Sequence, residues 1–155
     1  MNFNFFFSHI IDTRFLRIFK HLKLENQIKF RVRYSETDQM SFVYHANYVK
    51  YFEMGRISWL RNLGFSYKEM EEQGVLLPVI DLKINFRHSA RFDDELVLLT
   101  KLVKKPSYTI EFKYEISKNE KVITFGYTKL IFIKSSNNKP IRCPSNILDA
   151  ISLEQ

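Results

Sequence analysis

The sequence predicts one α+β domain in which an antiparallel sheet of about five strands curls around a single long helix. The first observation is the order of the hydrophobic patterns: a strand-like alternation, one long helical segment, and then four more strand-like segments. The second is the length of 155 residues, which suits one domain and lets roughly 68–70% of the unfolded surface be buried. The third is a 45% hydrophobic and 15% aromatic content, which is too high for a mainly disordered chain.

Residues 1–25 differ from the rest and are predicted to form a basic amphipathic helical extension, which leaves 26–155 as the domain. Such a helix can lie on a membrane surface and give peripheral membrane contact, act as an organelle transit sequence, or dock on the domain. A loosely attached extension, or a start codon placed too early, is the simpler explanation. No apolar run approaches the ~20 residues that span a bilayer.

The first strand and the long helix come next along the chain. Alternation of apolar and basic residues over 28–34 predicts a half-buried strand. A polar loop follows over 35–44, and an apolar-rich segment over about 46–63 predicts a helix that the fold encloses. Gly64 stands where a C-terminal cap glycine belongs, and Gly55 allows another backbone to approach closely.

Four further strands follow, and short connections indicate hairpins between them. Because hairpins join neighbouring strands, we expect these four to pair antiparallel. The expected elements are a short helical turn at 66–73, strands at 80–86, 96–103, 108–116 and 122–133, and a terminal turn at 146–151 capped by Ser145.

Asp38 and His45 are the residues on which a chemical interpretation rests. Asp38 lies in the polar loop, and His45 follows where the long helix is about to begin. The first N–H groups of a helix have no partner within it, so they can stabilise negative charge on a carbonyl oxygen under attack. A carboxylate facing a helix start therefore suits attack on a carbonyl. Taken alone, an aspartate in such a loop is more often a turn residue, and a histidine there is often a cap.

Two motifs give the chain a resemblance to a known family. The first reads YSETD over 34–38 and VYHANY over 43–48, and the second reads ARFDDEL over 90–96. Together they resemble the signature of the 4-hydroxybenzoyl-CoA thioesterase-like hotdog family, closest to the acyl-CoA thioesterase branch associated with the Tol–Pal system. The resemblance covers roughly residues 28–133. It implies a hotdog fold, a sheet wrapped around a central helix, with active sites where subunits of a homodimer or homotetramer meet.

The resemblance also implies roles for particular residues. The family's catalytic carboxylate falls on Asp38, and the position whose backbone N–H polarises the thioester carbonyl falls on His45. Family members usually have glycine where this chain has Ser41, so a positive φ in that turn would strain Ser41. The implied activity is hydrolysis of an acyl-CoA to a free acid and coenzyme A, with Asp38 as nucleophile or general base.

The substrate is expected to meet the chain in two places. Tyr44 and Ala46 are expected to bind it through backbone donors in the first helical turn. Coenzyme A is then part of the substrate, so no separate cofactor and no metal is expected. A solvated surface is the simpler explanation of any single basic residue proposed to contact it. The candidate contacts for the phosphates and pantetheine of coenzyme A are Arg87, Arg91, Lys104, Lys105 and Ser107.

Charge and absent motifs narrow the alternatives. The net charge of +7 suits an anionic partner such as coenzyme A, but equally a lysine-rich solvated surface. The sequence contains no phosphate-binding loop, dinucleotide fingerprint, serine nucleophile elbow or zincin motif, which removes those activities as leading hypotheses. Cys143 is the only cysteine, which favours a reducing compartment and a cytoplasmic location.

Two other functions stay open at this point. One is a non-catalytic assembly module that contacts a membrane or a partner through residues 1–25. The other is a hydratase acting on an enoyl thioester, which the loop fits less well. Nucleic-acid binding is not expected, because it favours basic and aromatic residues interleaved on one exposed face, and the basic residues Lys29, Arg31 and Arg33 are the nearest approach to such a face.

Overall fold

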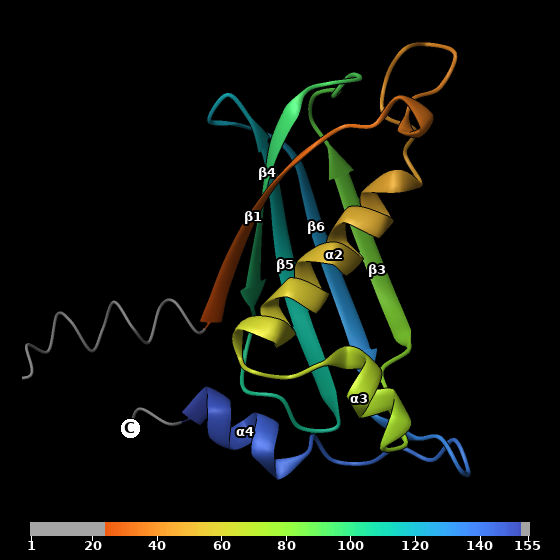
Figure 1. Cartoon of the computed structure of the whole chain (residues 1–155), viewed down its shortest axis with the longest axis vertical. Coiled ribbons are helices and arrows are strands. Elements are labelled where there is room, and N and C mark those ends of the chain that lie inside the picture. Colours follow the sequence, from red (N-terminus) through yellow and green to blue (C-terminus); the bar gives the residue numbers. More distant parts are fainter. Residues whose placement is uncertain (1–23, 153–155) are drawn as a thin grey trace, which may run out of the picture.

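The computed structural model describes residues 24–152, in which one sheet carries one long helix across its face (Figure 1). The sheet is five-stranded and antiparallel, in the order β1-β4-β5-β6-β3, and β2 and β7 pair separately. This confirms the predicted α+β class. The elements are β1 (Glu25–Arg31), η1 (Tyr34–Glu36), α2 (Asn47–Asn62), α3 (Tyr67–Glu72), β2 (Val75–Leu76), β3 (Val79–Phe86), β4 (Glu95–Leu102), β5 (Thr109–Lys118), β6 (Lys121–Ile131), β7 (Ile133–Lys134) and α4 (Ser145–Ser152).

Helix α2 lies close to the middle of the sheet because two glycines make room for larger side chains. A Cβ at Gly126 of β6 would collide with the ring of Phe52, which stacks on Tyr114 at a centroid distance of 4.4 Å. A Cβ at Gly55 of α2 would collide with Thr100 and Leu98 on β4. The close approach expected at Gly55 is therefore present, and strand side chains, more than backbone, occupy the space.

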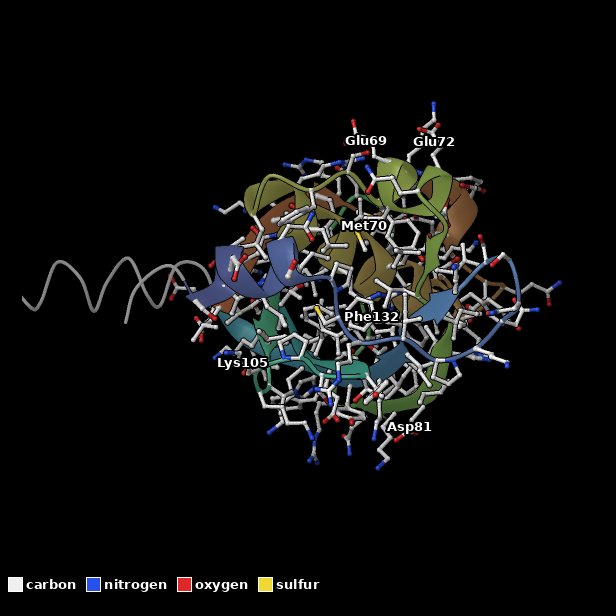
Figure 2. All side chains as sticks on the ribbon, turned by 90° about the horizontal axis from the view of Figure 1, so that it is seen from below. Glu69, Met70, Glu72, Asp81, Lys105 and Phe132 are labelled. Atoms are coloured by element: carbon white, nitrogen blue, oxygen red, sulfur yellow. The ribbon has the colours of Figure 1, made fainter. Side chains whose placement is uncertain are left out.

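The two ends of the sheet are closed differently. Helices α3 and α4 lie at the end where β3 begins and β4 finishes (Figure 1). Figure 2, seen from that end, shows Met70 and Phe132 pointing into the interior, while Glu69 and Glu72 of α3 point outward. Both inward side chains are buried. The opposite end carries the start of α2 and the loop before it.

The structure differs from the predicted enclosure of α2. Lys50, Glu53 and Arg61 are exposed, and Met54 keeps 36% of its surface accessible, so one face of α2 stays open in a single chain. Five strands cover only the opposite face of the helix. The apolar residue at Met54 thus reflects a surface that this one chain does not bury.

The first strand is also shifted from its predicted range. It begins three residues earlier, at Glu25, and ends at Arg31, and Tyr34 lies in the 3-10 turn that follows. Tyr34 therefore leaves the alternating pattern and is 78% exposed, with its ring packed against Phe92. The remainder of the predicted extension, residues 1–23, lies outside the described residues. Within 24–152 no helix has the length and apolar character needed to cross a membrane.

Candidate active site

The loop between η1 and α2 is a tight, internally bonded turn. An isolated bridge joins Thr37 to Val43, and the N–H of Asp38 donates to the carbonyl of Phe42 at 2.8 Å. The N–H of Ser41 closes the turn by donating to the carbonyl of Asp38 at 2.9 Å. Ser41 has φ of 62°, the positive value expected at the position where the resembling family has glycine. The strain anticipated for Ser41 is therefore present.

The carboxylate of Asp38 is partly buried and has a structural role in this turn. Its Oδ1 accepts the N–H groups of Met40 at 2.9 Å and Phe42 at 3.3 Å. Both hydrogen bonds that it accepts from described residues go to Oδ1, which leaves Oδ2 available to a substrate or a water. The turn role and the chemical role proposed for Asp38 are therefore compatible, because they use different oxygens.

Asp38 and His45 line the same pocket, which has a volume of about 340 Å³. Its walls come from the loop, from the start of α2 and from the end of β3 with the residues that follow it (upper right in Figure 1). The lining residues are Asp38, Met40, Phe42, Val43, His45, Tyr48, Phe86, Arg87, His88 and Ser89.

The start of α2 offers backbone donors at two positions. The N–H of Tyr44 is already bonded to the carbonyl of Glu36 at 2.9 Å, and the N–H of Asn47 to the carbonyl of Tyr44 at 2.9 Å. The backbone bonds found in residues 24–152 include none from the N–H of His45 or Ala46. Helix α2 also has no side-chain N-cap. Of the donors expected between Tyr44 and Asn47, the two at His45 and Ala46 are thus the ones left to a ligand.

Glu36 fixes both the loop and the helix start. Its carboxylate Oε2 accepts the N–H of Arg33 and the hydroxyl of buried Tyr51, each at 2.8 Å. Its backbone carbonyl accepts the side-chain amide of Asn47 at 2.8 Å in addition to the N–H of Tyr44. Burial and the bond to Glu36 both raise the pKa of Tyr51, so this hydroxyl stays protonated and donating.

The sequence did not single out Phe86, His88 and Ser89 as residues that line this pocket. The residues predicted to contact coenzyme A also lie in different places. Arg91 lies beside the pocket, with its guanidinium 4.6 Å from the ring centroid of Phe42. Lys105 and Ser107 lie between β4 and β5 at the opposite end of the sheet, so one chain does not bring them to Asp38. His88, to which the sequence assigned nothing, lines the pocket.

Other residues considered from the sequence have structural roles. Lys104 forms an ion pair with Glu111 at 3.0 Å on the other face of the sheet. Asp94 accepts the N–H of Arg91 at 2.7 Å and the ammonium of Lys118 at 2.6 Å, which places it at the entry to β4. No group of three or more metal-ligating side chains occurs within residues 24–152. Burial raises the pKa of Cys143 to about 12, so it is a neutral thiol at physiological pH and a poor nucleophile.

The pocket therefore combines one carboxylate oxygen, two open backbone donors at a helix start, and a histidine. Comparison with known proteins finds thioesterases. A family model described as the thioesterase-like superfamily matches residues 32–151. The acyl-CoA thioesterase YbgC of Haemophilus influenzae is 31% identical over 127 residues, which cover 80% of this chain and 93% of that one.

Two further comparisons agree. The putative acyl-CoA thioesterase YneP of Bacillus subtilis is 39% identical over 88 residues, 57% of this chain and 64% of that one. The crystal structure of a DHNA-CoA thioesterase from Staphylococcus aureus superposes with a TM-score of 0.73 at 38% identity and covers 76% of this chain and 80% of that one. The chain therefore belongs to the thioesterase-like superfamily and is a thioester hydrolase with the hotdog fold.

Proposed function

We propose that this protein hydrolyses an acyl-CoA with Asp38 as the reacting carboxylate and with the backbone N–H groups of His45 and Ala46 polarising the thioester carbonyl. The observation that carries the proposal is that Asp38 and His45 line one pocket at the uncapped start of α2. Each part of this arrangement serves acyl transfer, because a thioester needs one base or nucleophile and one donor set for its oxygen.

The chemistry follows from the hydrogen bonds of the loop. Oδ1 of Asp38 is held by two backbone N–H groups, so the carboxylate is oriented before substrate binds. Oδ2 then either attacks the thioester carbon, giving a mixed anhydride that water hydrolyses, or removes a proton from the water that attacks. In both routes negative charge develops on the carbonyl oxygen, where one preorganised donor is worth about 2.7–4 kcal/mol. The products are the free acid and coenzyme A.

The coenzyme A portion is proposed to contact the basic residues at the rim. Arg87 lines the pocket and Arg91 lies beside it, and guanidinium groups suit phosphate oxygens. Lys105 and Ser107 can contribute only from another subunit, because they lie at the far end of the sheet. The reaction needs no cofactor beyond its substrate.

A homodimer is proposed from the exposed edge of the sheet. Strand β3 is an edge strand that leaves Ile80 at 53%, Leu82 at 40% and Phe86 at 49% exposure. The other edge, β1, exposes Gln27, Lys29 and Arg31 and is therefore polar. An apolar unpaired edge favours pairing with a second copy, and a two-fold axis makes that pairing antiparallel. Assembly of two dimers into a tetramer, a cytoplasmic location and an association with the Tol–Pal system stay predictions.

The test is hydrolysis of a panel of acyl-CoAs, followed by detection of the free thiol. Asp38→Asn should lower kcat by at least about a hundredfold, because it removes the anion and keeps the shape of the side chain. Asp149→Asn, at an exposed position of α4, is the matched control and should behave as the parent. Unchanged activity of Asp38→Asn would remove Asp38 from the reaction. If the parent hydrolyses no thioester but loses membrane or partner binding on removal of residues 1–25, the assembly function would replace the enzymatic one.

A further inference from the structure

A second cavity lies at the other end of α2, away from Asp38. It has a volume of about 320 Å³, more than twice the roughly 150 Å³ that accommodates benzene in a protein core. Its walls are mainly apolar and come from α2, α3, the start of β3, and strands β5 and β6. The residues that line it are Glu53, Arg56, Ile57, Leu60, Tyr67, Glu71, Leu77, Val79, Ile110, Phe112 and Leu130.

Arg56 of this cavity has one donor without a partner. Its Nη1 is buried and has no hydrogen-bond acceptor among the residues that the structure describes. Burial raises the pKa of Tyr114, whereas the positive charge of Arg56 and a hydrogen bond between the two side chains oppose that rise, which places the guanidinium between α2 and the sheet. A buried donor that stays unsatisfied is costly, so its presence beside an open cavity points to a ligand that supplies the acceptor.

The position of this cavity along β3 relates it to the first pocket. Val79, the first residue of β3, lines the Arg56 cavity, and Phe86, the last, lines the Asp38 pocket. Because a β-bulge between Val79 and Asp81 adds one residue, six regular steps of about 3.3 Å separate the two residues, or about 20 Å in one chain. Antiparallel pairing of β3 with its copy, centred on Lys83, keeps side chains of the same face opposite each other and sets Val79 opposite Phe86 of the partner subunit. The Arg56 cavity of one subunit then adjoins the Asp38 pocket of the other.

We infer that the Arg56 cavity receives the far end of the acyl group whose thioester is held by Asp38 of the partner subunit, and that Arg56 selects acyl groups ending in an uncharged oxygen. This inference rests on the proposed function and names the substrate class of that site. The apolar walls accommodate the acyl chain, and the Nη1 of Arg56 donates to an oxygen at its end. Arg56 is a specificity-determining residue, and it takes no part in the hydrolytic step.

The glutamates of the cavity favour an uncharged oxygen over a negatively charged one at the end of the acyl group. Glu53 and Glu71 line the same space as Arg56, so a carboxylate at the end of the acyl group would be repelled by both. A hydroxyl accepts a hydrogen bond from Arg56 and can donate one to a glutamate, so it satisfies both the guanidinium and the carboxylate. We therefore expect a preference for hydroxyl over carboxylate and over a plain methyl end.

The experiment compares kcat/KM for plain acyl-CoAs, ω-hydroxyacyl-CoAs and ω-carboxyacyl-CoAs with chains of about six to twelve carbons. Because a hydrogen bond from a charged donor is involved, the parent should prefer the hydroxyl by about tenfold to a hundredfold at the best chain length. Arg56→Met should abolish that preference, Arg56→Lys should retain part of it, and Arg61→Met, on the exposed face of the same helix, should leave it intact. An unchanged hydroxyl-to-methyl ratio in Arg56→Met, or a preference for the carboxylate in the parent, would overturn the inference.

A mixed dimer tests whether Arg56 acts across the interface. Asp38→Asn and Arg56→Met subunits, carrying different tags, are coexpressed and the heterodimer is purified. One of its two sites then combines Asp38 of one subunit with Arg56 of the other, so the preference for the hydroxyl should return. If Arg56 acted within its own subunit, the only site with Asp38 would carry the Arg56→Met substitution and show no preference. Loss of activity in Asp38→Asn with no preference in any dimer would reject this inference and leave the proposed function intact.

Discussion

The hydrogen bond between Glu36 and Tyr51 is predicted to hold the reacting loop on α2. Tyr51 is 1% exposed, and its hydroxyl donates to Oε2 of Glu36 at 2.8 Å. Glu36→Ala leaves that hydroxyl without its acceptor, which costs about 1–3 kcal/mol. The bond from the N–H of Arg33 adds little, because Arg33 is exposed and water can replace the carboxylate.

The expected loss of about 2 kcal/mol is measurable in both stability and rate. For a chain of this size it lowers Tm by about 4–8 °C. Because the carbonyl of Glu36 holds the N–H of Tyr44 and the amide of Asn47, a shift of Glu36 also moves the donors at His45 and Ala46. A displacement of about 1 Å at a reacting centre costs roughly a hundredfold, so kcat/KM should fall by about tenfold to a hundredfold.

The assay is a double-mutant cycle of Glu36→Ala and Tyr51→Phe, followed by chemical unfolding and by acyl-CoA hydrolysis. The two changes should be less than additive by about 1–2 kcal/mol, since either one removes the same bond. Tyr34→Phe serves as the control, because that hydroxyl lies on an exposed ring. Additivity within about 0.5 kcal/mol would show that the bond does not stabilise the loop and would refute the reasoning.

Two further predictions concern the loop and the entry to β4. Ser41→Gly should raise the free energy of unfolding by about 0.5–1 kcal/mol in a thermal melt, because it relieves a positive φ at some cost in unfolded-state entropy; a loss of stability would mean that the serine is unstrained. Burial raises the pKa of Asp94, but the bond from Lys118 and the N–H of Arg91 outweigh burial and lower the net pKa. This carboxylate therefore stabilises the fold above its unfolded pKa, and the contribution is lost as the pH falls through its lower folded value. Lys118→Met should be about 1 kcal/mol less stable at neutral pH and should lose less stability on acidification; an identical pH dependence would contradict the assignment.

The fold was predictable because its signals are local. Alternation of apolar residues identified the strands, and Gly64 adopts the positive φ of 87° expected of a cap glycine. Tyr34 shows where a local pattern fails, because the alternation continues past Arg31 while the chain already turns. The fit of Gly126 under Phe52 could not be inferred, since it depends on the register that sets β6 beside β5 and on where α2 crosses them.

The candidate site was predictable in part for the same reason. Asp38 and His45 are close in sequence, so the motif that contains them also places them in one pocket. Residues 87–89 reach that pocket from the end of β3, a contact that only the tertiary structure determines. Lys105 was predicted as a phosphate contact because of its charge. In antiparallel strands joined by hairpins, however, successive connections lie at alternate ends of the sheet. The connection between β3 and β4 is at the Asp38 end, so the next one is at the other end.

Two features that a single chain leaves incomplete lie on the side of β3. The apolar edge at Leu82 and the unpaired Nη1 of Arg56, beside Val79, are each costly for an isolated subunit in water. A second copy across β3 would bury the first and bring the partner's substrate to the second. One antiparallel pairing would thus satisfy two unrelated deficits, which is why the reacting carboxylate and the residue that selects its substrate are assigned here to different subunits.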